Sequence, residues 1–169
     1  MLRALIARHP ELVGEAEQLS RLAVTEVDVE AVAAAVEDAV LALDLDDLNA
    51  RAGRQRWGYV EPTEAAWALL EEALEPFLDE MRRRIELGFE GAAVQTCHGI
   101  VLGLYRCRGQ TTDKVLGWAE DFPGEAAGEA VGTLTRRSGA KGRRIWRLPA
   151  GIMAEVPEWA DLIERAVRR

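Results

Sequence analysis

Lysine, cysteine, histidine and serine are scarce in this 169-residue chain, and each shortage narrows the functions that the sequence allows. Only Lys114 and Lys141 are lysines, so arginine supplies nearly all of the positive charge. Ser20 and Ser138 are the only serines, and neither lies in the strand–turn–helix pattern that exposes a serine nucleophile. The sequence therefore argues against a serine hydrolase.

The chain contains only two cysteines, Cys97 and Cys107. Two cysteines in a chain with 49% hydrophobic residues are not a disulfide scaffold, and reduced thiols are typical of a reducing compartment. The N-terminal sequence MLRALIARHPELVGEAEQ lacks the long apolar core and the cleavage site of a signal peptide. These features predict a cytoplasmic protein.

No long hydrophobic run is present either. The longest stretch without a formal charge is residues 91–105, GAAVQTCHGIVLGLY, and Gln95, Thr96 and His98 interrupt it. Such a stretch is too short to cross a bilayer as a helix, which needs about 20 apolar residues. We expect a buried helix here and no membrane span.

Basic residues are fewer than acidic residues, so the net charge is −8 and the isoelectric point is near 4.9. An acidic chain repels both a phosphate backbone and an anionic membrane surface. Nucleic-acid binding is therefore unlikely and no membrane role is expected. The partners that remain are proteins, with self-association included.

Helical periodicity is abundant. Asp28 is a good N-cap for a helix whose apolar residues, from Val29 to Leu43, repeat at intervals of three and four. The sequence DLDDLNARAG continues or restarts this helix until Gly53 ends it. The strongest helical pattern covers residues 63–87, where Pro76 is expected to kink or split the helix and Gly88 to end it.

The uncharged stretch predicts a central buried helix over about residues 89–106. Its Gly99-x-x-x-Gly103 spacing removes two side chains from one face, so a second helix can approach closely. Shorter helical segments are predicted at 2–9, 11–23, 113–119, 122–137 and 157–169. The fold class is all-α, an antiparallel bundle or a short helical-repeat-like stack of about six to eight helices.

A single all-helical domain, 1–169, fits the length. We divide it into short N-terminal helices (1–27), a helical core (28–135), a basic loop (136–156) and a C-terminal helix (157–169). An offset of 34 residues aligns VEAVAAAVEDAV with TEAAWALLEEAL, which is the tetratricopeptide period. Because alanine and glutamate are common throughout, a repeat and an irregular bundle both stay open.

Three phrases carry a family resemblance: RWGYVEPTEAAWALLEEALEPF, GFEGAAVQTCHGIVLGLYRC and VLGWAEDFP. They are similar to the helical region that accompanies SWIM zinc fingers in some bacterial proteins, over about residues 50–125. The C-x-C…C-x-H ligand set of the finger itself is absent. The resemblance implies a helical accessory or scaffold domain, without a metal or nucleic-acid role.

Cys97, His98 and Cys107 are the only cluster of soft metal ligands, and the candidate pocket residues are Cys97, His98 and Tyr105. Neighbours in a helix point about 100° apart, so Cys97 and His98 cannot close on one metal ion or act as a nucleophile–base pair. A zinc site needs four ligands. We interpret the cluster as packing residues and keep a small-molecule pocket, or an enzyme site around His98, as the alternative; no metal or cofactor is expected.

Arginine and aromatic residues gather between two helical patterns, in residues 54–61. This segment must be a connection, and it carries Arg54, Arg56, Trp57 and Tyr59. In one interpretation the aromatics fold back over the helix ends and the arginines meet acidic helix faces. In the other, the segment binds a partner, since Trp, Tyr and Arg are the usual interface anchors.

A second basic segment, 136–147, contains no acidic residue. Its candidate contact residues are Arg136, Arg137, Lys141, Arg143, Arg144 and Trp146. A solvated loop, an acidic protein partner and, as a minor alternative, nucleic acid are all compatible with this composition. The sequence identifies no specific function, and it favours a non-enzymatic helical interaction or scaffold module over an enzyme.

Overall fold

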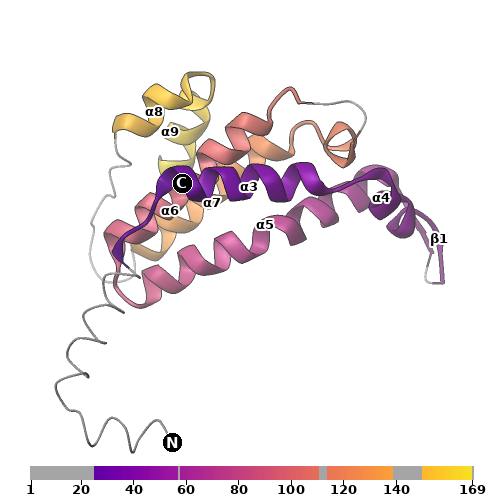
Figure 1. Ribbon diagram of the computed structural model, residues 1–169, viewed down its shortest axis with the longest axis horizontal. Helices are drawn as coiled ribbons and strands as arrows, with labels where there is room; N and C mark the ends of the chain where they lie inside the picture. The colour runs from indigo at the N-terminus through magenta and orange to yellow at the C-terminus, as the bar shows by residue number, and fades with distance from the viewer. Residues whose placement is uncertain (1–24, 57, 111–113, 139–149, 169) are drawn as a thin grey trace, which may run out of the picture.

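The chain is an all-α bundle with one small β-hairpin (Figure 1). The computed structural model describes residues 25–56, 58–110, 114–138 and 150–168. In chain order the elements are α3 (Val29–Ala42), α4 (Leu45–Arg51), β1 (Gly53–Gln55), β2 (Gly58–Val60), α5 (Pro62–Glu86), α6 (Glu90–Cys107), η1 (Val115–Trp118), α7 (Phe122–Ser138), α8 (Ala150–Glu155), η3 (Pro157–Trp159) and α9 (Ala160–Arg168). The predicted fold class is confirmed.

Aspartates begin the first two described helices. The Oδ1 atom of Asp28 accepts hydrogen bonds from the backbone N–H groups of Glu30 and Ala31, at 3.0 and 3.1 Å. Asp44 caps α4 in the same way, and the Oδ2 atom of Asp47 accepts from the backbone N–H of Asp44 at 3.1 Å. This reciprocal capping box restarts the helix.

Helix α5 passes through Pro76 without a break, so of the two expected effects, a kink or a split, the split is wrong. Proline removes the N–H that would bond the carbonyl of Glu72, four residues earlier. Both Pro76 and Glu72 lie on the exposed face of α5, where water can bond the released carbonyl oxygen. The helix ends where predicted, at Gly88, whose φ of 80° favours glycine.

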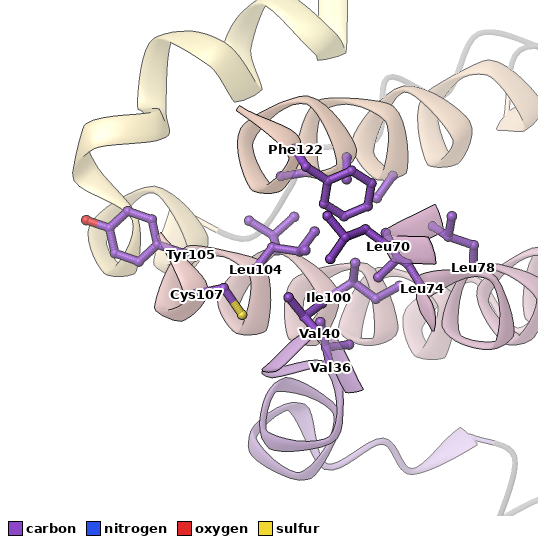
Figure 2. Packing of buried hydrophobic residues seen from close by; sticks show 14 of the residues in the cluster. Val36, Val40, Leu70, Leu74, Leu78, Ile100, Leu104, Tyr105, Cys107 and Phe122 are labelled. Carbon is purple, nitrogen blue, oxygen red and sulfur yellow. The ribbon is translucent and has the colours of Figure 1, made fainter. Parts of the chain in front are cut away.

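Helix α6 is the centre of the bundle, and α3, α5 and α7 each pack against it. Twelve of its 18 residues are buried. Figure 2 shows Ile100 and Leu104 of α6 beside Leu70 of α5 and Val40 of α3, with Phe122 of α7 above them. The prediction that the uncharged segment is a buried helix is confirmed.

The predicted close approach at Gly99 and Gly103 occurs between α6 and α3. A Cβ atom on Gly99 would lie 2.6 Å from the Cβ of Val32, and one on Gly103 would lie 2.5 Å from the carbonyl oxygen of Ala33. Real Cβ atoms do not approach other atoms this closely. The two helix backbones therefore need glycine at both positions.

The C-terminal part contains more helix than the predicted basic loop over 136–156 allows. Helix α7 continues through Ser138, and α8 forms at Ala150–Glu155. Helix α8 packs on α6, while α9 packs on α7. Between Ser138 and Ala150 the predicted loop lies outside the described residues, as do the helices predicted at 2–9 and 11–23.

The 34-residue offset places α3 on the first half of α5, and repeat-like stacking stays a prediction. Helix α5 has 25 residues and α3 has 14, so the two helices that the offset aligns differ in length. None of the helices that the structure describes combines the length and the apolarity that a bilayer crossing requires.

Candidate functional site

The segment between α4 and α5 is a β-hairpin, whereas its sequence predicts only a connection. Strands β1 and β2 are antiparallel, and Arg54 is the cross-strand partner of Tyr59. The hairpin projects from the end of the molecule at which α4 lies (Figure 1). Gly53 begins it with a φ of 89°, a conformation that glycine adopts without steric cost.

The base of the hairpin is anchored to the helical body. Ala52 and Val60 pack against the hydrophobic core. The Gln55 side chain donates to the backbone carbonyl of Arg51 at 3.0 Å. Arg51 in turn donates two hydrogen bonds of 2.6 Å to the carboxylate of Glu72 on α5, which lowers the pKa of Glu72. The hairpin therefore leaves the bundle in a defined direction.

The side chains on the hairpin face solvent. Tyr59 is 64% exposed, and Arg54 and Arg56 are exposed as well. Within the described part of the chain, neither arginine makes an ion pair or a side-chain hydrogen bond. The exposure of Tyr59 speaks against the interpretation in which it folds back over the helix ends, and the interpretation that the arginines meet acidic helix faces stays a prediction. Trp57 lies outside the described residues.

Other exposed apolar side chains belong to elements at the same end. Four large hydrophobic side chains are exposed in the described part of the chain, and Leu45, Tyr59 and Trp118 are three of them. Leu45 begins α4, and Trp118 ends η1, which packs against α4. We call these residues, with Arg54 and Arg56, the hairpin end. It combines positive charge that has no ion-pair partner among the described residues with exposed apolar surface, as interfaces do.

Cys97, His98 and Tyr105 lie in three different surroundings. Cys97 is fully buried in the core, where burial raises the pKa of its thiol to about 12. The Nε2 atom of His98 lies 3.2 Å from Oε2 of Glu155 on α8. Tyr105 is 8% exposed and packs edge-on against Trp159. Cys97 and Tyr105 are therefore buried packing residues, while His98 is part-buried and contacts an exposed carboxylate.

No group of three or more histidine, cysteine, aspartate or glutamate side chains in the described ranges is placed to hold a metal ion. The second cysteine, Cys107, is also a buried free thiol, with a pKa raised by burial to about 12. A protonated thiol is a poor nucleophile and a poor metal ligand. The chemistry available at these two residues is therefore that of apolar packing.

The basic segment, 136–147, lies only partly within the described residues. Arg136 and Arg137 belong to the last turns of α7, and nothing further about their side chains is described. Lys141, Arg143, Arg144 and Trp146 lie outside the described residues. The hypothesis that this segment contacts a partner stays a prediction.

A groove of about 890 Å³ runs between α5, α7 and α9, and sequence reasoning missed it. Three separate helices line it, so no single sequence pattern contains it. Trp67 of α5 and Phe122 of α7 meet edge-to-face on its wall, with ring centroids 5.2 Å apart. A smaller hollow of about 350 Å³ lies beside Cys107 and η1. Cys97, His98 and Tyr105 line neither of these two hollows.

Comparisons with protein families, with curated proteins and with solved structures find no match to this chain.

Proposed function

We propose that this chain is a non-enzymatic helical interaction module that uses its hairpin end to bind a protein partner. The observation that carries the proposal is the exposed cross-strand pair of Arg54 and Tyr59 on a hairpin with an anchored base. Tyrosine and arginine are over-represented among residues that dominate binding energy. Holding them on a braced hairpin reduces the entropy that binding would otherwise cost.

The composition of the hairpin end suggests the chemistry of the partner. Arg54 and Arg56 are free to meet carboxylates, while Tyr59, Leu45 and Trp118 offer apolar contact area. A protein surface with acidic groups around an apolar centre is complementary to this arrangement. A second copy of the chain, which has a net charge of −8, also carries such acidic surface, so self-association belongs to the proposal.

A scaffold role agrees with the resemblance to the helical region beside SWIM zinc fingers, which implies an accessory domain. A cytoplasmic location is also part of the proposal. Its support is that Cys97 and Cys107 are both free thiols, as is usual in a reducing compartment.

Affinity capture with quantitative mass spectrometry tests the proposal. The bait is the full chain, compared with the double variant Arg54→Ala/Tyr59→Ala and with Asp38→Ala, which changes an exposed residue of α3. We expect the wild type and Asp38→Ala to retain the same proteins. For at least one of these proteins, the amount captured by the double variant should be about tenfold lower. Light scattering on the three baits reports self-association through the same surface. If neither the retained proteins nor the mass differ between the double variant and the wild type, the proposal fails.

A further inference from the structure

The groove between α5, α7 and α9 is a second interaction surface, distinct from the hairpin end. We propose that it binds one amphipathic helix of a partner protein, with arginine or lysine along the edges of that helix. The proposal does not depend on the function of the hairpin, because the two surfaces share no residue.

The shape of the groove suits a helix. Its α5 wall extends from Trp67 to Arg82, a rise of roughly 22 Å along the helix axis. Its α7 side contains Gly124 and Gly128, one turn apart. A Cβ atom on Gly128 would lie 3.4 Å from Leu162 of α9, an ordinary van der Waals contact, so α9 lies close to α7 along this side of the groove. A helix of about 15 residues matches this length.

The chemistry of the groove is mixed in a way that selects an amphipathic occupant. Apolar side chains supply one part of the lining, and charged side chains supply the other. The apolar members are Trp67, Leu74, Leu78, Phe122, Ala126, Leu162 and Ala166. Leu74, Leu78, Phe122 and Ala126 are already buried in the bundle, so a partner helix gains its apolar contact from the half-exposed Trp67, Leu162 and Ala166. An occupant with one apolar face and two polar edges covers these three side chains and leaves the charged ones at its edges.

The unpaired charge of the groove is mainly negative. Glu71 of α5 and Glu125 and Glu129 of α7 are exposed, and their carboxylates have no ion-pair or hydrogen-bond partner within the described ranges. Arg82 is already bound to Glu75 and Asp79, at 2.6 and 2.9 Å. Three unpaired carboxylates along two walls therefore favour an occupant with basic edges over an acidic or neutral one.

Arg165 is the exception to the negative charge of the groove lining. Its Nε atom donates to the backbone carbonyl of Asp161 at 3.1 Å, which keeps the guanidinium on α9. This places a positive charge on one wall and leaves the α5 and α7 walls acidic. The difference between the walls gives the occupant a preferred orientation, with its basic residues toward Glu71, Glu125 and Glu129.

Peptide binding measured by fluorescence anisotropy tests this proposal with the full chain. The probe is a labelled helical peptide of about 15 residues with leucine and alanine on one face and arginine on both edges. A matched peptide has glutamate in place of every arginine. We expect the arginine peptide to bind and the glutamate peptide not to bind. The double variant Glu125→Gln/Glu129→Gln, which keeps side-chain shape, should weaken binding about tenfold, through the loss of two charge pairs.

Asp38→Asn/Glu64→Gln is the matched control, because it removes two exposed charges from α3 and α5 outside the groove. This control and Arg54→Ala/Tyr59→Ala should leave peptide binding unchanged, which separates the groove from the hairpin end. Equal binding by Glu125→Gln/Glu129→Gln and wild type would overturn the proposal. So would a dimer in light scattering that the same double variant dissociates, because the occupant would then be a second copy of the chain.

Discussion

Gly103 of α6 lies so close to α3 that a Cβ atom at this position would be 2.5 Å from the carbonyl oxygen of Ala33. The atom on the other side of this contact belongs to the backbone and cannot move away by changing a side-chain rotamer. The bundle is therefore closed by a direct backbone-to-backbone approach between its two most tightly packed helices.

Replacing Gly103 with alanine should destabilise the protein by about 2–3 kcal/mol, because the two helices must separate to admit a methyl group. Chemical denaturation measures the free energy of unfolding. Gly91→Ala is the control in the same helix, since a Cβ there has no neighbour within 4 Å. It should be neutral or slightly stabilising, because alanine favours helix over glycine. Equal effects of the two variants would contradict the close approach.

Much of the helical framework could be predicted because each signal is local. Asp28 caps a helix through its own neighbours, and the Gly99–Gly103 spacing reports a close approach within one helix face. Whether Pro76 splits its helix depends on exposure, which the sequence does not give directly. Water can replace the lost backbone hydrogen bond on a solvent-facing side.

The two tyrosines of the chain should respond oppositely to truncation. Tyr105 packs edge-on against Trp159 at 5.1 Å, and the guanidinium of Arg108 lies over its ring. Tyr105→Ala should therefore cost about 3 kcal/mol of unfolding free energy. Tyr59→Ala should change stability by less than about 0.5 kcal/mol, because its side chain is 64% exposed. A large loss of stability in Tyr59→Ala would mean that Tyr59 supports the fold.

Both thiols should be inert in the native protein. Burial raises the pKa of Cys97 and of Cys107 to about 12, so only about one thiol in ten thousand is ionised near pH 8. A chromogenic disulfide reagent should label neither cysteine until denaturant unfolds the chain. Gln95→Cys is the control, because position 95 is exposed on the same helix and its thiol should react at once. Native labelling of Cys97 or Cys107 at the rate of that control would contradict the buried positions.

Glu158 of η3 should make stability depend on pH. Its carboxylate accepts two hydrogen bonds from Arg108, at 2.8 and 2.9 Å, and this contact lowers its pKa below the usual 4.5. A carboxylate whose pKa is lowered by folding stabilises the fold above its unfolded pKa and loses that effect as pH falls through the folded pKa. The wild type should thus have a higher melting temperature than Glu158→Gln at neutral pH, and the difference should shrink as the pH falls below 4.5 through the lowered pKa of Glu158. A difference that does not change with pH would contradict the ion pair.

The candidate sites were harder to predict than the helices. Each hairpin strand has three residues, too few for alternation of apolar and polar side chains to be recognised. The available signal was a glycine at the start of each strand, Gly53 and Gly58, and we interpreted Gly53 only as a helix stop. The groove depends on how α5, α7 and α9 meet, which is tertiary information.

Site-specific photo-cross-linking in living cells tests the hairpin end most directly. A photoreactive phenylalanine analogue replaces Tyr59 in one variant and Asp38, on the exposed face of α3, in the other. We predict that position 59 cross-links to one protein, or to a second copy of this chain, and that position 38 does not. Identical cross-linking patterns at the two positions, or none at position 59, would contradict the account.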